Sequence, residues 1–492
     1  MNSIGHHSLS IQWQKIRQRI NSSLANVFNQ SLSKDFYYSC VVDATPLFYW
    51  QSWGLVNSLI QCAKVLPQQI YVHCTPEVDR AFLEQLKTLG INLKAIERFG
   101  DGKYCNKIAQ LKTEELTRAK CVFLLDTDTI VLGQLTEVYT DNVIKGKIVD
   151  LANPQLSVLQ EIFTQAGFSD HPAICSADYE ADLTFANNFN GGFYAVPGNL
   201  IKHLGERWHY WALWLIENCS ILKRINKQDH VDQISFAMAS HELSLSVEQI
   251  NRQFNYPLHL EEEKTGYPRV IHYHRNISPT GMLEVTGEQD SEFSLAVEDA
   301  NRLLGRCFNN QIFWSFRYQM YAELGSGVGS RGENLNYKRE LLRKLGIETS
   351  QSILDVGCGD LEVIKAFKLS NYTGVDISSQ AIELARQKRP DLNFILLENN
   401  LSIPAADLVI CLEVLIHQHN YDDYQRLIKF LIDKTINKLI VSGYTEEKSH
   451  HHDNHMVNFQ ESLIDSLSNT GAFSHLEIVG RHTDVDIILA IK

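Results

Sequence analysis

Residues 121–129 read CVFLLDTDT, and this stretch decides how the first half of the chain is expected to fold. Val122–Leu125 form a short apolar run, which predicts a strand buried on both faces of a sheet. Asp126 and Asp128 follow two residues apart, so in an extended chain both carboxylates leave the strand end on the same side. Open α/β sheets bind ligands at the carboxyl ends of their strands. Two carboxylates there suit a hard divalent cation that holds a diphosphate, although a loop-capping Asp126 and a solvated Asp128 are the alternative.

The chain from residue 36 onwards alternates between strand-like and helix-like segments. Asp43 ends the first expected strand as Asp126 ends the fourth, so both acids are expected at one edge of the sheet, which is the expected site. The alternation itself predicts a mostly parallel sheet with helices on both faces. The strands are expected at 37–42, 69–74 and 92–96, and the helices at 49–64, at 77–89 and from about 106.

Two polar motifs further along the chain are candidates for the same site. Phe189–Gly192, FNGG, precedes an expected strand at 193–196, and its paired glycines allow backbone to approach a ligand closely. An ordinary turn has the same pattern. Asp229 and Asp232 lie where a helical segment begins, so they are candidates to contact an acceptor or accept a proton, or they simply cap the helix.

A strand-like segment at 269–274, RVIHYH, carries His272 and His274 on one face. A neutral imidazole is a good third ligand for Mn²⁺ beside two carboxylates. The sequence does not choose between the two histidines, and a purely structural role is the alternative for each.

Taken in order, these segments resemble a GT-A-fold glycosyltransferase that uses a nucleotide-sugar donor, over about residues 36–280. The resemblance rests on the strand ending at Asp43, Asn106-Lys107, Asp126-Thr127-Asp128, Asn190-Gly191-Gly192, Asp232-Gln233 and His272-Tyr273-His274. An isolated Asp-x-Asp is a weak motif, whereas this ordered series is specific.

The resemblance implies a role for each matching residue. Asp126 and Asp128 would bind Mn²⁺, or Mg²⁺, together with the donor diphosphate, which UDP most commonly supplies in similar folds. The metal would stabilise the charge on the departing nucleoside diphosphate. Lys107 would assist on the phosphates, and Asp43, Asn190 and Gly191 would help to hold the donor. An inverting enzyme needs a carboxylate base, for which Asp229 and Asp232 are both candidates; whether the reaction inverts or retains stays open.

A second constellation, SILDVGCGD at 352–360, predicts a strand, a glycine turn and then a helix over 361–367. A second strand ends in Asp376, an acid placed to accept hydrogen bonds from ribose hydroxyls. NAD is disfavoured because Glu362 replaces the third glycine of the dinucleotide motif and, with Asp360, would repel a pyrophosphate. A cationic cofactor without phosphate fits better, which indicates S-adenosylmethionine.

The rest of the chain resembles a class I S-adenosylmethionine-dependent methyltransferase of seven strands, over about 336–492. Further strands are expected at 393–397, 408–412 and 438–442, followed by a terminal hairpin. The resemblance is carried by Asp355, Gly357, Gly359 and Asp376. It implies close backbone approach at the two glycines, ribose binding at Asp376 and a possible adenine contact at Asn399.

The methyl acceptor is harder to infer. His417 is a candidate base, as is His452 in the histidine-rich loop at 450–455, which could instead bind a metal or be an exposed loop without a catalytic role. Methyl transfer from a sulfonium mainly needs alignment and the exclusion of water, so the base could matter little.

Composition limits the remaining possibilities. The 492 residues exceed one ordinary core, and the net charge of −13 argues against nucleic-acid binding. The 10 cysteines form no CxxC pair, and neither a signal peptide nor a membrane span is recognisable, so a cytoplasmic location is expected. Residues 1–35 contain an amphipathic helical patch that could lie on an anionic membrane, or pack on its own domain or a partner.

The expected fold is therefore α/β with two domains, an N-terminal GT-A domain (nucleotide-sugar-binding, Rossmann-like) and a C-terminal methyltransferase domain. They would occupy 36–280 and 336–492, after an extension at 1–35 and joined by a helical linker at 281–335. Within that linker, Gly325–Gly332 is either flexible or folded over the second site. The expected protein is bifunctional, adding a sugar to a glycan or glycolipid in polysaccharide biosynthesis and methylating a sugar hydroxyl. The alternative is one catalytic domain beside a binding or scaffolding module, and the oligomeric state stays open.

Overall fold

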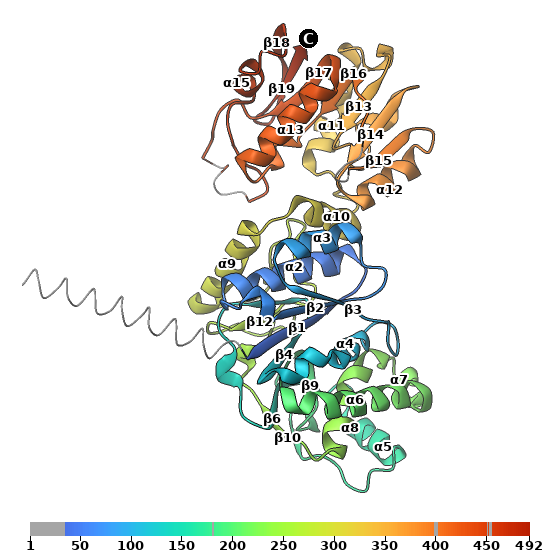
Figure 1. Cartoon of the computed structure of the whole chain (residues 1–492), viewed down its shortest axis with the longest axis vertical. Coiled ribbons are helices and arrows are strands. Elements are labelled where there is room, and N and C mark those ends of the chain that lie inside the picture. Colours follow the sequence, from blue (N-terminus) through green and yellow to red (C-terminus); the bar gives the residue numbers. More distant parts are fainter. Residues whose placement is uncertain (1–34, 180–181, 398–401, 450, 452–454) are drawn as a thin grey trace, which may run out of the picture. The chain divides into compact units, whose positions relative to one another are not determined.

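The computed structural model describes residues 35–179, 182–397, 402–449, 451 and 455–492. The chain forms two compact α/β units (Figure 1). The first contains 51–276 and 285–300 together with the chain up to Ala44, and the second contains 45–50, 277–284 and 301–492. The amphipathic patch expected within residues 1–35 lies outside the described residues.

The first unit is built on a seven-stranded sheet, as the alternating pattern predicts. Neighbouring strands are parallel except at β9, which is antiparallel to both β4 and β6. The strands in sheet order are β10 (Ser246–Gln249), β6 (Val143–Ile148), β9 (Phe189–Pro197), β4 (Cys121–Leu125), β1 (Phe36–Val42), β2 (Ile70–Cys74) and β3 (Asn92–Ala95).

Helices cover both faces of this sheet, because its central strands are apolar on both sides. Every residue of β4 is buried, as expected for the run that precedes Asp126. In Figure 1, α2 and α3 lie on one side, and α4, α6 and α8 lie on the other. The helices of the unit include α2 (Pro46–Gln61, whose first turn belongs to the second unit), α3 (Arg80–Thr88), α4 (Asn106–Ala109), α5 (Leu156–Gln165), α6 (Gly198–Asn218), α7 (Ser220–Arg224), α8 (Val231–Glu242) and α9 (Ser291–Arg306).

A smaller sheet brings two distant motifs of the first unit together. β5 (Thr129–Val131) begins directly after Asp128 and pairs antiparallel with β12 (Val270–His272), so that His272 lies opposite Thr129. β11 (Tyr256–Pro257) flanks β12 on its other side. The pairing of β5 with β12 is what places the histidine motif beside the Asp-x-Asp motif.

The FNGG motif does not precede a strand as expected. Phe189–Gly192 instead form the first part of β9, whose residues are all buried. Glycine is required at positions 191 and 192 of this strand, because neighbouring site residues already occupy the space that a side chain there would fill.

The second unit has the seven-stranded sheet with a terminal hairpin that its sequence predicts. β19 is antiparallel to β17 and β18, and the remaining pairs are parallel. The strands in sheet order are β15 (Asn393–Leu396), β14 (Tyr372–Asp376), β13 (Ile353–Val356), β16 (Ala406–Cys411), β17 (Thr435–Gly443), β19 (Val485–Ile491) and β18 (His475–His482).

Alternate residues of these strands enter two hydrophobic cores, one on each face of the sheet. Val409 packs in the core with α13 and α15, whereas its neighbours Leu408 and Ile410 pack in the core with α11 and α12. The helices of the unit include α10 (Asn310–Met320), α11 (Gly332–Lys344), α12 (Ser379–Lys388), α13 (Tyr421–Lys434) and α15 (Leu463–Ser468).

The prediction of a helix over 361–367 is wrong. The chain forms only a short 3-10 turn at Ile364–Ala366. Leu361 has a φ of 63°, in the left-handed region, and such a residue cannot continue a right-handed helix.

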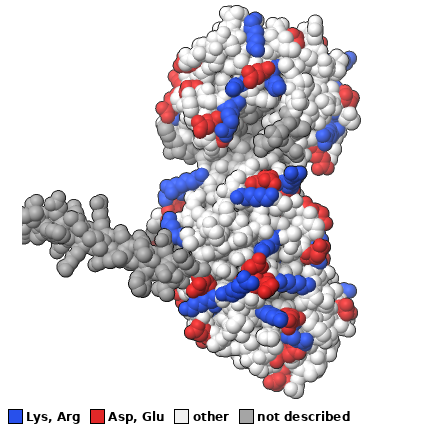
Figure 2. Space-filling model, viewed as in Figure 1, with Lys and Arg blue, Asp and Glu red and all other residues white. Residues whose placement is uncertain are grey.

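The surface and the helix lengths bear on possible partners. On the face drawn in Figure 2, acidic and basic side chains are interspersed, in contrast to the single basic face typical of nucleic-acid-binding proteins. Within the described part of the chain, no helix is both long and apolar enough to cross a membrane.

Candidate active sites

A largely buried lysine, with its side chain 16% exposed, lies at the centre of the first candidate site. α4 places Lys107 so that its Nζ is 2.8 Å from Asp126 and 3.1 Å from Asp232, at the start of α8. The same ammonium donates to the carbonyl oxygen of Gly191 at 3.3 Å. Burial opposes its charge, but the two carboxylates outweigh burial and raise the pKa of Lys107. Burial also raises the pKa of Asp126, although Lys107 acts in the opposite direction.

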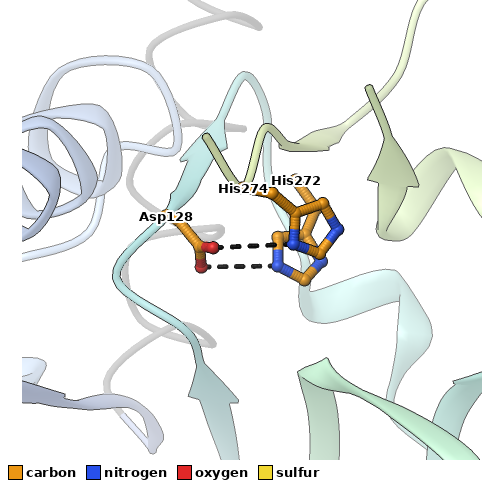
Figure 3. Close-up of side chains that lie close together, drawn as sticks. All are labelled: Asp128, His272 and His274. Carbon is orange, nitrogen blue, oxygen red and sulfur yellow. Dashed lines mark ion pairs between the residues drawn. The ribbon is translucent and has the colours of Figure 1, made fainter. Parts of the chain in front are cut away.

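Asp128 faces two imidazoles instead. Its carboxylate lies 3.3 Å from His272 Nε2 and 3.7 Å from His274 Nδ1, as Figure 3 shows. Burial alone would raise the pKa of Asp128, yet His272 lowers it to about 2. Burial lowers the pKa of His274 to about 3, whereas Asp128 overcomes burial and raises that of His272.

The ring and carboxylate atoms of Asp128, His272 and His274 fit a metal ion. One potential ligand atom from each lies within 4.8 Å of the others. Mixed imidazole and carboxylate ligands suit Mn²⁺ and related divalent ions. The structure thus brings both candidate histidines to Asp128, while Asp126 contacts Lys107.

The two glycines of β9 lie directly against these groups. A Cβ on Gly191 would be 2.6 Å from Lys107 Nζ, and one on Gly192 would be 2.5 Å from the His272 ring. Asn190 donates to Asp150 at 2.7 Å and accepts a hydrogen bond from Asn255 at 3.0 Å. The motif therefore lines the site and packs directly against its charged and polar side chains.

Asp43 and the two candidate bases, Asp229 and Asp232, have different surroundings. Asp43 forms an ion pair with Arg98 at 2.8 Å and accepts a hydrogen bond from Thr75. Burial opposes the ionisation of Asp43, but Arg98 outweighs it and lowers the pKa. Asp229 is exposed, whereas Asp232 is buried beside Lys107, so the structure separates the two candidate bases.

Sequence reasoning missed two further polar residues in the first site. Asp150 and His259 form a second potential ligand group with His274. Asp150 follows β6 as Asp43 follows β1, so an acid just beyond a strand end was a usable signal. His259 carries no comparable signal, because its position depends on how β11 pairs.

The second candidate site is a pocket of about 250 Å³ at the carboxyl ends of β13, β14 and β16. Asp355, Gly357 and Asp376 line it. Asp376 accepts hydrogen bonds from the backbone amides of Gly359 at 3.0 Å and Ser378 at 2.9 Å. The four predicted residues therefore lie together, whereas Asn399 lies outside the described residues.

Burial dominates the electrostatics of this pocket. It raises the pKa of Asp376 to about 6, although the backbone amides act in the opposite direction. It raises the pKa of Asp355 to about 7, against a 2.7 Å hydrogen bond from the Tyr372 hydroxyl.

The glycine-rich segment 325–332 folds over this pocket, which settles its two interpretations. Ser326 and Ser330 line the pocket. The Ser326 hydroxyl donates to Asp360 at 2.8 Å, and Arg331 forms an ion pair with the same buried carboxylate. Two separate contacts thus attach the segment to the glycine turn.

His417 lies in the pocket wall with a defined tautomer. Its Nδ1 is 2.6 Å from the carbonyl oxygen of Met456, which can only accept, so Nδ1 carries the hydrogen. Burial lowers the pKa of His417, so the neutral ring keeps Nε2 as its basic nitrogen. His452 lies outside the described residues. His451, from the same loop, is buried against Tyr444.

Two sequence families match the chain, one in each half. Residues 39–244 match a family described as Rhodobacterales glycosyltransferase domain, and residues 354–431 match a methyltransferase domain family. The chain therefore combines a glycosyltransferase domain and a methyltransferase domain, both of which are enzyme domains. A comparison with curated proteins found no match.

Solved structures with similar folds include representatives of both classes. Galactosyltransferase LgtC, in complex with donor and acceptor sugar analogues, is 15% identical with a TM-score of 0.32. The match spans 55% of this chain and 96% of the LgtC chain. Magnesium protoporphyrin IX methyltransferase from Synechocystis, with bound SAM, is 20% identical, covers 32% and 78%, and has a TM-score of 0.26. N-methyltransferase NodS from Bradyrhizobium japonicum is 12% identical, covers 32% and 86%, and has a TM-score of 0.28.

Proposed function

We propose that the chain is a bifunctional enzyme that transfers a sugar from a nucleotide-sugar donor and methylates a hydroxyl with S-adenosylmethionine. The observation that carries the first activity is the convergence of Asp126, Asp128, Lys107 and His272 at one strand end of a glycosyltransferase domain. The catalytic parts correspond to residues 36–280 and 336–492. The acceptor is a glycan or glycolipid in polysaccharide biosynthesis, and the enzyme acts in the cytoplasm, with residues 1–35 available for membrane contact.

In the donor site, Asp126, Asp128 and His272 would hold Mn²⁺ or Mg²⁺. We choose His272 over His274 because its Nε2 lies 3.3 Å from Asp128, whereas His274 Nδ1 lies 3.7 Å away. Bound there, the ion would supply Lewis-acid stabilisation of the departing nucleoside diphosphate, most commonly UDP. Lys107 adds a buried positive charge that can pair with a phosphate oxygen once it exchanges one of its carboxylate partners. Asn190 and Gly191 would line the donor site, and Asp43 would lie at its outer edge.

Asp232 is the carboxylate that can act on the acceptor. It is buried and lies 3.1 Å from Lys107, whereas Asp229 faces solvent. A base must lie within hydrogen-bond reach of the proton that it accepts. We therefore assign the base of an inverting reaction, or the polar anchor of a retaining one, to Asp232.

In the methyltransferase pocket, Asp376 would accept hydrogen bonds from the ribose hydroxyls of S-adenosylmethionine, and Asn399 would contact the adenine. Gly357 and Gly359 have φ values of 76° and 54°, a left-handed backbone that lets the turn pass close to the cofactor. His417 Nε2 would take the proton of the acceptor hydroxyl, with His452 as the other candidate. Segment 325–332 and the apolar pocket wall exclude water, which the transfer requires.

The decisive experiment measures hydrolysis of a panel of UDP-, GDP-, dTDP- and CMP-sugars with Mn²⁺, in the wild type and in Asp128→Ala. We expect slow, metal-dependent release of one nucleoside diphosphate, reduced more than about 100-fold in the variant because a ligand is lost. Unchanged S-adenosylmethionine binding by Asp128→Ala would show that the variant is folded. No hydrolysis and no donor binding across the panel would instead support a methyltransferase that carries a glycan-recognition domain.

A further inference from the structure

A second group of potential metal ligands lies beside the first. Asp150, His259 and His274 each place one ligand atom within 4.8 Å of the others. Asp150 follows β6, His259 follows β11 and His274 follows β12, so three separate elements converge. The backbone bond from Leu258 N to His272 O, at 3.0 Å, extends the β11–β12 pairing and fixes where His259 lies. The rings of His259 and His274 are 4.3 Å apart between centroids.

Neighbouring groups hold Asp150 in place. Lys147 forms an ion pair with one of its oxygens, and Asn190 donates to the other at 2.7 Å. Each carboxylate oxygen has a second lone pair, so both remain able to bind an ion. Carboxylates that bind metals are usually oriented by such hydrogen bonds. Lys147 also pairs with Asp178 at 3.0 Å, and Asp178 pairs in turn with Arg252 at 3.1 Å.

His274 has an unusual backbone conformation that supports a functional role. Its φ is 51°, in the left-handed region, where a residue with a side chain is strained by about 1 kcal/mol or more. Gln51 secures the turn by donating to the His274 carbonyl oxygen at 3.2 Å. Strained residues of this kind concentrate at functional sites, where the surrounding structure maintains them.

The two nitrogens of His274 have different surroundings. Nδ1 faces Asp128 at 3.7 Å, whereas Nε2 is buried and has no hydrogen-bond partner within the described part of the chain. A buried nitrogen without a partner is costly unless a ligand satisfies it. His272 lies closer to Asp128, at 3.3 Å, so Asp128 keeps an imidazole partner when His274 binds another ligand.

We propose that Asp150, His259 and His274 bind a second divalent transition-metal ion, next to the ion held by Asp126, Asp128 and His272. Two imidazoles with one carboxylate suit Zn²⁺ and Mn²⁺. Ligands about 2.1 Å from one ion lie roughly 3–4 Å apart, so the three side chains close onto it by movements of about 1 Å or less. The inference rests on the proposed nucleotide-sugar site and deepens it.

The charge balance of the site favours a second cation. The cluster contains three cationic groups, those of Lys107, Lys147 and Arg252, and six carboxylates, those of Asp126, Asp128, Asp150, Asp178, Asp232 and Glu262. One divalent ion leaves this cluster negative, which disfavours a diphosphate. A second ion makes it positive and therefore attractive to the donor.

The test is the number of metal ions bound by the full chain. After stripping with a chelator, the protein is titrated with Mn²⁺, and free Mn²⁺ is followed by electron paramagnetic resonance. We expect two tightly bound Mn²⁺ ions per chain in the wild type and one in His259→Ala. His203→Ala, which removes an exposed histidine of α6, is the matched control and should retain two.

One bound Mn²⁺ in the wild type, or two in His259→Ala, would overturn the proposal. Asp128→Asn separates this outcome from failure of the donor site. If the wild type binds one ion and hydrolyses the donor, and Asp128→Asn binds none, the second site alone is wrong. If no Mn²⁺ binds and hydrolysis needs no metal, the metal-dependent donor site is wrong as well.

Discussion

In the first site, Asp128 faces His272 and His274, and despite its burial the pKa is lowered to about 2 by His272. In the second, Asp376 accepts hydrogen bonds from backbone amides, and burial raises its pKa to about 6. Asp128 lies just after β4 and Asp376 ends β14, and each strand belongs to a sheet of seven strands. Their difference therefore comes from the groups around each carboxylate.

This difference matches the ligands that each site is proposed to bind. A diphosphate needs positive charge, and the first site surrounds its acids with Lys107 and the imidazoles, where a metal ion can join them. A cofactor with a sulfonium and ribose hydroxyls needs acceptors instead. The second site provides them in the carboxylate of Asp376, which is held by neutral amide donors. The predictions below test this contrast.

The largest effect should come from Asp232→Asn, which removes the negative charge that pairs with Lys107 in the donor site. We expect sugar transfer to fall roughly 100-fold or more, as for loss of a general base or an essential polar anchor. Initial rates of nucleoside diphosphate release, with Mn²⁺ and acceptor, provide the measurement.

Asp229→Asn is the matched control, because the same chemical change occurs three positions earlier on an exposed side chain. It should alter transfer by less than about twofold, in line with most surface substitutions. Equal losses in the two variants would mean that burial beside Lys107 does not select the functional carboxylate.

The next largest effect concerns the methyltransferase pocket and should leave the activity of the donor site unchanged. Asp376→Ala removes the proposed ribose acceptor, and hydrogen bonds to a charged group contribute about 1.5–3 kcal/mol. We expect S-adenosylmethionine to bind roughly 10- to 100-fold more weakly by isothermal titration calorimetry, with donor hydrolysis unchanged. Wild-type affinity in this variant would remove Asp376 from the cofactor site.

The sequence predicted the fold of each unit because the strands are short apolar runs that end at polar residues. It also identified the acids at the strand ends, since this position depends only on local periodicity. It predicted Asp126 and Asp128 at one site but not their separate contacts, which are with Lys107 for Asp126 and with the histidines for Asp128. That division depends on the pairing of β5 with β12, which no local pattern specifies.

The other omissions have the same origin. Asp150 and His259 meet at His274 only because β6, β11 and β12 end near one another. The contacts of Ser326 and Arg331 with Asp360 could not be distinguished from a flexible linker by composition alone. The helix expected after Gly359 was wrong because Leu361 adopts a left-handed backbone, which its residue type does not predict.

The smallest effect is a pH dependence that should appear in the second site. Burial raises the pKa of Asp376 to about 6, so below this pH the acid becomes protonated and loses its capacity to accept two ribose hydrogen bonds. Affinity for S-adenosylmethionine should therefore be constant above pH 7 and fall about tenfold by pH 5, where some nine in ten Asp376 side chains are protonated.

Asp376→Asn isolates this titration, because the amide keeps one acceptor oxygen but cannot ionise. Its affinity should be weaker than that of the wild type at pH 7.5 and nearly independent of pH down to 5. A parallel decline in both proteins would assign the pH dependence to another group, for which Asp355 is a candidate because it lines the pocket and has a pKa of about 7. A flat wild-type profile would mean that the bound cofactor keeps Asp376 ionised, and the contrast with the ion-paired Asp128 would then hold only for the unliganded protein.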